Sequence, residues 1–238
     1  MNETKTLTTK ELRVKGRKKC WSPSQRFWME VSLYLTTPFL RTSITPNMIT
    51  VTWIILEIFA FYLFTLGEYW INVLAVILFN FIALIGDHID GNLARMKEKF
   101  SLLGPYLEQL GIFFGTPLIF LGLAIGNYFR YQNFLFLIIS LVGVLFWLFE
   151  KIIRINPVWF SERQEEIVKK FYVKASFRSA SKTRIFFEIF RRGQPFYFLF
   201  FCVVFDYTQL ASLVYSFLFL FEFCRKLYIN IKNLNKKV

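Results

Sequence analysis

Long apolar runs separated by short polar segments dominate the chain. The first run, Met48 to Leu66, has about the 20 residues that a membrane-spanning helix needs, and Thr45-Pro46-Asn47 before it is typical of a helix start. Five further runs predict spans over Trp70 to Gly86, Leu102 to Ile125, Asn133 to Ile153, Gln194 to Phe205 and Gln209 to Phe223. We therefore expect an all-α membrane protein, a bundle of six transmembrane helices. Two of the turns are expected at Gly126 to Gln132 and around Asp206.

The region before the first span has a different pattern. Residues 1–24 are polar and basic, without an apolar run, and we expect no cleavable signal peptide. Over residues 25–43, large apolar side chains recur at helical spacing between charged ones: Phe27, Trp28, Val31, Tyr34 and Leu35. This pattern favours an interfacial, juxtamembrane amphipathic helix that ends near Pro38. We thus expect a cytoplasmic arm and amphipathic helix in residues 1–43, and a six-helix membrane domain in residues 44–238.

Composition and charge support a membrane protein over a soluble one. Of the 238 residues, 55% are hydrophobic and 20% aromatic, and the mean hydropathy is +0.43, which is unusual for a soluble domain. If six spans are present, 28 of the 29 Lys and Arg residues fall on one side and only Arg130 falls on the other. Because basic residues gather on the cytoplasmic side, we expect both termini there and no binding of nucleic acid.

Two other classes of protein find little support. The three cysteines are scattered and form no Cys-x-x-Cys pair, which argues against a disulfide framework or a zinc site. A channel or transporter is a further class, but the chain has no convincing internal repeat.

Two acids follow the second apolar run. If the helix continues through them, Asp87, Asp90, Gly91 and Ala94 lie at i, i+3, i+4 and i+7, on one helix face. Paired carboxylates repel unless a cation lies between them, and oxygen ligands of this kind suit Mg²⁺, Mn²⁺ or Ca²⁺. The small residues beside them let a ligand approach the backbone. The pattern therefore indicates a metal site at this helix end.

Two charged residues nearby extend this interpretation. Arg95 can offer a fixed fork of donors to phosphate oxygens. Glu108, early in the next helix, can complete the metal site. The alternative is a pair of solvated acids at a helix end, but acids at a helix C-terminus oppose the helix dipole.

These residues resemble a known signature. The CDP-alcohol phosphatidyltransferase family carries Asp-x-x-Asp-Gly-x-x-Ala-Arg, then eight or nine residues, then Gly-x-x-x-Asp-x-x-x-Asp. Here the spacing is eight, and the matching positions are Asp87, Asp90, Gly91, Ala94, Arg95 and Gly104. Glu108 stands at the third aspartate of the signature and Ile112 at the fourth.

The resemblance implies an activity and its participants. A membrane-embedded phosphotransferase of this kind moves a substituted phosphate from a CDP-linked donor, CDP-diacylglycerol or a CDP-alcohol, to a hydroxyl acceptor and releases CMP, in phospholipid or related biosynthesis. The implied cofactor is Mg²⁺ or Mn²⁺, and the implied assembly is a homodimer. The implied metal ligands are Asp87, Asp90 and Glu108, and the implied CDP-binding residues are Gly91, Ala94 and Arg95.

Other residues join the implied site less directly. Pro46-Asn47-Met48-Ile49-Thr50 resembles a Pro-Asn-x-x-Thr sequence common in the same family, so Asn47 and Thr50 either line the nucleotide pocket or cap the helix. The basic stretch containing Arg178, Lys182 and Arg184 either binds an anionic acceptor or is cytoplasmic charge without a ligand.

The sequence does not identify the residue that takes the proton from the acceptor hydroxyl. The family is thought to use its fourth acid as the general base, and Ile112 cannot take a proton. Either Glu108 or His88 serves as the base, or the acceptor reacts without one, or the protein is a degenerate homologue that binds nucleotide or lipid or acts as a scaffold. We expect an active transferase.

Glu57 is the remaining acid of note. It falls near the middle of the first span, where an ionised acid costs about 2.5 to 3.5 kcal/mol. We expect it to face other helices, either as a hydrogen-bonded structural residue or as a contact to substrate.

Overall fold

The computed structural model describes residues 9–16, 23–101, 103–159 and 196–234, and every element in these ranges is helical. Before the first long helix come α1 (Thr9–Gly16), α2 (Pro23–Thr36) and a short 3₁₀ helix, η1 (Thr37–Arg41). The long helices are α3 (Pro46–Thr65), a continuous run of α4 (Tyr69–Ile77), a π-helical segment η2 (Leu78–Ala83) and α5 (Leu84–Lys97), then α6 (Leu103–Tyr131) and α7 (Phe134–Trp159). The last helices of the described residues are α10 (Tyr197–Val204) and α11 (Thr208–Leu234).

Four helices in the described ranges are long and apolar enough to cross a membrane: Pro46–Thr65, Tyr69–Lys97, Leu103–Tyr131 and Phe134–Ile153. They correspond to the first four predicted spans. The predicted fifth span begins at Gln194, outside the described residues, and α10 has only eight residues. The sixth corresponds to α11, whose second half carries charged residues. The count of six spans stays a prediction.

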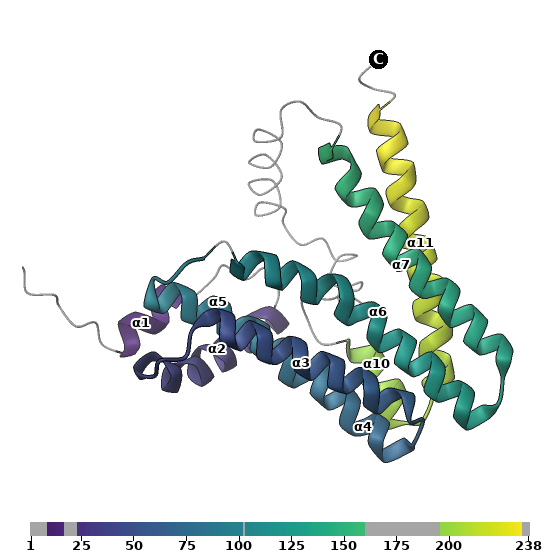
Figure 1. Ribbon diagram of the computed structural model, residues 1–238, viewed down its shortest axis with the longest axis horizontal. Helices are drawn as coiled ribbons and strands as arrows, with labels where there is room; N and C mark the ends of the chain where they lie inside the picture. Colours follow the sequence, from purple (N-terminus) through teal and green to yellow (C-terminus); the bar gives the residue numbers. More distant parts are fainter. Residues whose placement is uncertain (1–8, 17–22, 102, 160–195, 235–238) are drawn as a thin grey trace, which may run out of the picture.

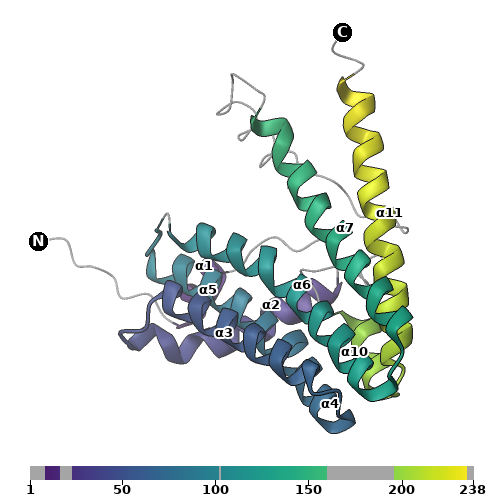
Figure 2. The same ribbon diagram turned by 45° about the vertical axis from the view of Figure 1, so that its right-hand side comes forward.

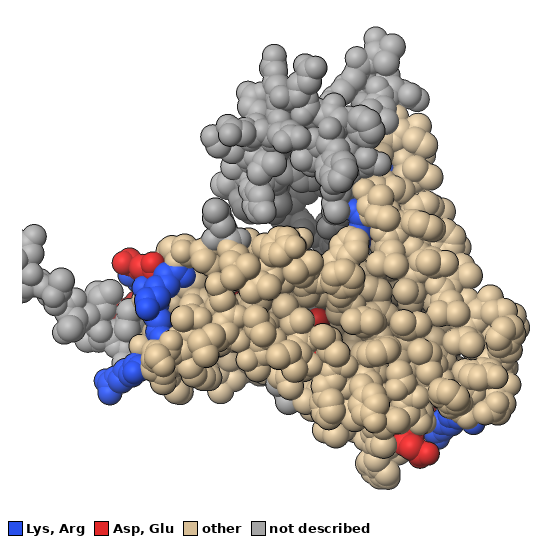
Figure 3. Space-filling model, viewed as in Figure 1, with Lys and Arg blue, Asp and Glu red and all other residues tan. Residues whose placement is uncertain are grey.

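The helices form two parts that share one core (Figures 1 and 2). Helices α3 to α6 lie together with α2 and α1 beside them, whereas α7 and α11 pair with each other and extend away from this body. Figure 3 shows the surface over helices α3 to α6. Between the two ends of these helices it is almost free of charged side chains, apart from one small acidic spot. An uncharged band of this kind suits helices that face lipid.

Aromatic side chains fill the junction between the two parts. Tyr215 of α11 is fully buried, and its ring centroid lies 4.6 Å from that of Phe120 on α6. Phe196, just before α10, lies 5.6 Å from Tyr215 and 6.1 Å from Phe120 in the same measure. These contacts join α6, α10 and α11 in one core.

Polar side chains in the interior are paired across helices. Asn127 of α6 donates to Ser212 of α11 (3.0 Å) and accepts from Thr208 (2.6 Å). Asn80, in the π-helical segment, accepts from the backbone N–H of Phe196 (2.8 Å) and donates to its carbonyl (3.3 Å). Because an unpaired polar group in an apolar interior is costly, these bonds fix how α11 and α10 dock.

One turn differs from the sequence prediction. The predicted turn at Gly126 to Gln132 is wrong, because α6 continues to Tyr131 and only two residues separate it from α7. Gly126 lies on the face of α6 that meets α3, where a side chain would overlap the carbonyl oxygen of Phe64. The chain reverses instead at Gln132, whose φ is +52°.

The juxtamembrane region contains a helix, and much of its predicted apolar face is not packed against the other helices. Helix α2 contacts α5, and its buried residues are Met29, Ser32, Leu33 and Thr36. Phe27, Tyr34 and Leu35 are exposed. Pro38 lies near the start of η1, so the α-helix ends at Thr36 and a 3₁₀ turn follows. The location of α2 at the membrane interface stays a prediction.

Glycines on one face of α6 set its distance from α3. A methyl group at Gly111 would overlap the Trp53 ring, and one at Gly115 would overlap the Glu57 carboxyl. A methyl group at Gly122 would lie 2.7 Å from the carbonyl oxygen of Phe61. Gly111, Gly115 and Gly122 thus let α6 lie close to α3. Small residues do this in membrane proteins because they let the two backbones approach.

We expect Gly122→Ala to lower the melting temperature in detergent. The added methyl group meets a backbone oxygen that cannot rotate away, at a cost of about 1 to 3 kcal/mol. The matched control is Gly104→Ala on the same helix, where the nearest atom is the Asn47 side-chain oxygen at 3.3 Å, and it should leave the melting temperature nearly unchanged. Equal melting temperatures for the two variants would contradict close α3 to α6 packing.

Candidate functional site

The acidic motif, residues 87–95, lies on a continuous helix. Tyr69 to Lys97 runs without a break through the π-helical segment into α5, so the predicted helical spacing of Asp87, Asp90, Gly91 and Ala94 is confirmed. Asp87 lies close enough to Asp90 for the two charges to repel each other. The first two predicted metal ligands are therefore neighbours on one helix face.

Side chains of α3 donate hydrogen bonds to Asp90, the second of these acids. Asp90 is 9% exposed, and one oxygen, Oδ2, accepts hydrogen bonds from the Thr50 hydroxyl (2.6 Å) and the Trp53 indole N–H (2.9 Å). Two donors on one oxygen fix the orientation of the carboxyl group. The acid is thus positioned by a neighbouring helix 40 residues away in sequence.

Trp53 can reach Asp90 because glycines on two helices make room for its ring. It is 2% exposed. On one side a methyl group at Gly86 of α5 would lie 2.8 Å from its Cβ, and on the other a methyl group at Gly111 of α6 would overlap the ring. The indole is therefore enclosed by α5 and α6, and it links the acidic motif to the helix that carries Glu108.

The sequence analysis did not identify Trp53. One available signal was its spacing, because Thr50, Trp53 and Glu57 lie at i, i+3 and i+7 on one face of α3. The other was Gly86, one residue before Asp87, since a glycine within a helix often marks close approach of a neighbour.

Thr50 and Asn47 have contacts that differ from simple capping. The helix cap is Thr45, whose hydroxyl oxygen accepts from the backbone N–H of Met48 (3.3 Å). The oxygen of Asn47 accepts from the Ser101 hydroxyl (3.1 Å), and the Ser101 oxygen accepts from the N–H of Gly104 (3.1 Å). These bonds join the start of α6 to the first turn of α3.

Arg95 connects the motif to the N-terminal arm. Its Nε donates to the carbonyl of Gly16 in α1 (2.7 Å), and its Nη2 donates to the Asn92 oxygen (2.6 Å). Asn92 is fully buried and donates to Ser32 of α2 (2.9 Å). The guanidinium lies over Gly91, where a methyl group would be 3.3 Å from Nη1. Arg95, the residue predicted to bind phosphate, is thus held directly by α1 and, through Asn92, by α2. The sequence analysis did not name Asn92.

The other residues predicted for the site are not seen to join the group around Asp90. Glu108 is exposed on α6 and His88 is half-buried on α5. Arg178, Lys182 and Arg184 lie outside the described residues. Within the described ranges, no group of three or more His, Cys, Asp or Glu side chains is arranged to hold a metal ion.

The donor set at Asp87 and Asp90 still fits one cation. Mg²⁺ commonly binds through one or two carboxylates together with substrate phosphates, without a complete protein cage. A pair of acids on one helix face, one of them fixed by two donors, meets that requirement. The two acids therefore suit one divalent cation that takes its remaining ligands from outside the protein.

We expect Thr50→Val to lower the free energy of unfolding by about 1 to 3 kcal/mol, because the buried oxygen of Asp90 loses a donor. Unfolding in mixed detergent micelles measures this. Thr52→Val is the matched control, since Thr52 lies on the same helix, is exposed and donates only to the Met48 carbonyl; its effect should stay within about 0.5 kcal/mol. If both variants lose equal stability, the bond to Asp90 contributes nothing of its own.

Comparison with known proteins identifies a family. A search of curated proteins found no match. The family model described as CDP-alcohol phosphatidyltransferase matches residues 43–189, which is more than half of the chain and includes the acidic motif, Glu108 and helices α3, α5 and α6. This protein belongs to the CDP-alcohol phosphatidyltransferase family.

Proposed function

We propose that this protein transfers a substituted phosphate from a CDP-linked donor to a hydroxyl acceptor in phospholipid or related glycolipid or polymer biosynthesis. The acceptor oxygen forms a bond to the phosphorus that bears the alcohol or lipid, the bond from that phosphorus to the CMP oxygen breaks, and CMP leaves while the hydroxyl loses its proton. Family membership supports this reaction. The observation that carries the proposal is the fixed Asp90 carboxyl beside Asp87 within the family's motif.

The motif residues have distinct proposed roles. Asp87 and Asp90, with Glu108 from α6, bind Mg²⁺ or Mn²⁺; a bound cation supplies charge neutralisation for the diphosphate and the leaving phosphate. Arg95 presents its donors to the CDP phosphates, and Gly91 and Ala94 let the CDP portion approach the helix backbone. These roles agree with the shared face of the motif and with the bracing of Arg95 by Asn92.

Asn47 and Thr50 complete the proposed nucleotide side of the site. Both lie in the first turns of α3, where Thr50 already contacts Asp90 and Asn47 contacts Ser101. Arg178, Lys182 and Arg184 are the proposed contacts to a charged part of the acceptor. Glu108 or His88 is the proposed proton acceptor.

We propose the membrane arrangement from the same features. Six spans with both termini in the cytoplasm put the motif at the cytoplasmic edge, where nucleotide-activated donors are made. The exposed Phe27, Tyr34 and Leu35 of α2 suit contact with the membrane interface. A homodimer is the proposed assembly.

A second candidate is a homologue that binds nucleotide or lipid, or acts as a membrane scaffold, without catalysis. The observation that favours it is Ile112 at the fourth acidic position. Loss of a carboxylate there removes a cation ligand and the proton acceptor at once.

We expect purified protein with Mg²⁺ to release CMP when it is given a CDP-linked donor and a suitable hydroxyl acceptor, and Asp87→Asn to lower that rate at least about a hundredfold, as general estimates for lost charge stabilisation suggest. The measurement is CMP formation by chromatography. Asp206→Asn is the control, since Asp206 pairs with Arg130 away from the acidic motif, and its rate should equal that of the wild type.

Absence of CMP with every donor and acceptor pair would contradict the transferase proposal. If Ile112→Asp alone produced activity in that case, the wild-type chain would be the degenerate homologue.

A further inference from the structure

Asn92 lies within the acidic motif but not on the face that carries its acids. It follows Asp90 by two residues, so its side chain projects roughly 200° around the helix from that of Asp90. On that side α5 contacts the N-terminal helices α1 and α2 (Figures 1 and 2). Asn92 is fully buried there, and a buried amide needs hydrogen-bond partners.

The amide of Asn92 joins α2 to Arg95. Its nitrogen donates to the hydroxyl oxygen of Ser32 (2.9 Å), and its oxygen accepts from Nη2 of Arg95 (2.6 Å). Ser32 is fully buried, and its hydroxyl donates to the carbonyl of Met29 (2.8 Å). Because that bond uses the one hydroxyl proton, Ser32 can only accept from Asn92. The amide oxygen is therefore turned toward Arg95.

A backbone carbonyl fixes another part of the same guanidinium group. Nε of Arg95 donates to the carbonyl of Gly16, in α1 (2.7 Å). Gly16 can lie this close because it has no side chain: a methyl group there would be 2.6 Å from the end of Met96 and 2.9 Å from that of Leu33. Bonds at Nε and at Nη2, to acceptors on two different helices, together set the plane of the guanidinium group.

Both of these acceptors are uncharged. A carboxylate at either position would orient the guanidinium group but would also neutralise it. An amide oxygen and a backbone carbonyl orient it without cancelling its positive charge. The group lies over Gly91, where a methyl group would be 3.3 Å from Nη1. A phosphate that approaches the backbone at this glycine therefore meets a cation whose orientation is already set.

Fixing the side chain in advance favours binding. A free arginine side chain has many rotamers, and most of that freedom is lost when it holds a ligand. Bonds that hold the bound orientation beforehand remove this cost from the binding step. Without the Asn92 oxygen, Arg95 would keep its charge but would sample more orientations, so its affinity for phosphate would fall.

We propose that Asn92 is a positioning residue for the nucleotide: with the carbonyl of Gly16 it orients Arg95 toward the phosphates of CDP, and Ser32 of α2 orients Asn92 in turn. This inference rests on the proposed function, in which Arg95 binds those phosphates. It makes the N-terminal helices part of the nucleotide site although they do not belong to the acidic motif.

The test measures binding of CDP with Mg²⁺ to the full chain in detergent by isothermal titration calorimetry. Asn92→Leu keeps the side-chain size but has no acceptor, and should raise the Kd about three- to tenfold, the range that one hydrogen bond provides. Asn127→Leu is the matched control, since Asn127 is also buried and bonded to Thr208 and Ser212, near the C-terminal end of α6. It should lower the melting temperature as Asn92→Leu does and leave the Kd unchanged.

A double-mutant cycle separates positioning from a general loss of structure. Arg95→Met removes the guanidinium group and should itself weaken CDP binding. If Asn92 acts through Arg95, then adding Asn92→Leu to Arg95→Met should change the Kd by less than about twofold, because coupled residues are not additive.

A pair of variants in α2 tests the contribution of Ser32. Ser32→Ala removes the acceptor that fixes the Asn92 amide, and should raise the Kd for CDP about twofold or more. Thr36→Val is the matched control one turn later on the same helix. Thr36 is also buried, and its hydroxyl donates to the carbonyl of Ser32 (2.6 Å), so its loss should leave the Kd unchanged.

An unchanged Kd in Asn92→Leu, an equal rise in Asn127→Leu, or additive effects in the cycle would overturn the positioning role. If CMP were still released in that case, the proposed transferase would stand. The expected changes in Kd, in a protein that releases no CMP from any donor, would support the positioning role and contradict the proposed function. A wild-type chain that binds no CDP would overturn both.

Discussion

The arrangement of this protein depends on the two hydrogen bonds that Asp90 receives from α3. A buried carboxyl without donors would be strongly destabilising in this apolar setting. Thr50 and Trp53 supply those donors, and they can do so only if α3 and α5 run side by side at this level. Gly86 and Gly111 then become necessary, because the Trp53 ring needs space on both of its sides. The chemistry of one acid thereby constrains the packing of three membrane helices.

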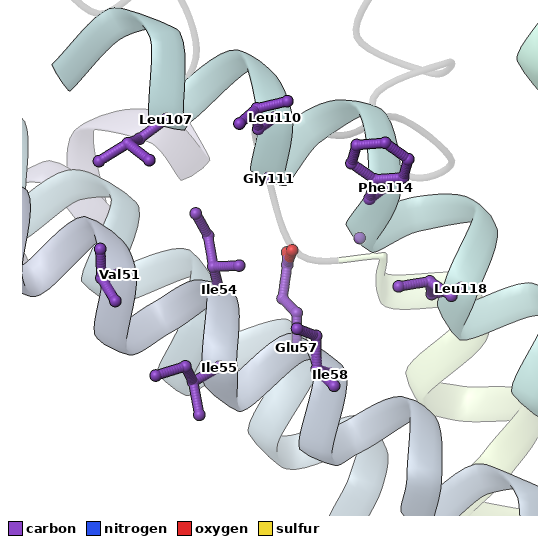
Figure 4. A pocket seen from close by; sticks show the side chains of 11 residues that line it. Val51, Ile54, Ile55, Glu57, Ile58, Leu107, Leu110, Gly111, Phe114 and Leu118 are labelled. Atoms are coloured by element: carbon purple, nitrogen blue, oxygen red, sulfur yellow. The ribbon is translucent and has the colours of Figure 1, made fainter. Parts of the chain in front are cut away.

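The acidic motif and an apolar cavity between α3 and α6 arise from the same packing. The glycines that admit Trp53 and Glu57 also remove side chains from the face of α6, and the remaining space is this cavity (Figure 4). Leu107 of its wall immediately precedes Glu108. The bracing of Arg95 through Gly16 and Asn92 extends this organisation to the N-terminal arm.

Sequence alone predicted the parts of the fold that depend on local pattern. The first four apolar runs correspond to long helices, and the helical spacing of Asp87, Asp90, Gly91 and Ala94 is as expected. The placement of Glu57 against another helix is also confirmed. Apolar periodicity and the cost of a charge in lipid were sufficient for these. The family signature identified the motif for the same reason, since its residues are close together in the chain.

Features that depend on contacts between distant segments were not predicted. Nothing local distinguishes Trp53 from other aromatic residues in an apolar helix, and its role depends on Gly86 and Gly111 far along the chain. The extension of α6 past Gly126 was missed because a glycine followed by polar residues resembles a turn, whereas here it accommodates Phe64 and Gly67 of the neighbouring segment. The second face of α2 was not predicted for a similar reason: Met29 and Leu33 pack against Met96, and this contact with a residue far along the chain leaves no local pattern.

The central claim is that the Asp90 carboxyl, fixed by α3, acts with Asp87 to hold the cation that accompanies a cytidine diphosphate. Anomalous X-ray diffraction from crystals soaked with CDP and Mn²⁺ tests it most directly. The account predicts a manganese peak within coordinating distance of both Asp87 and Asp90, next to the diphosphate of CDP. A manganese peak elsewhere, or CDP bound away from these two acids, would contradict it.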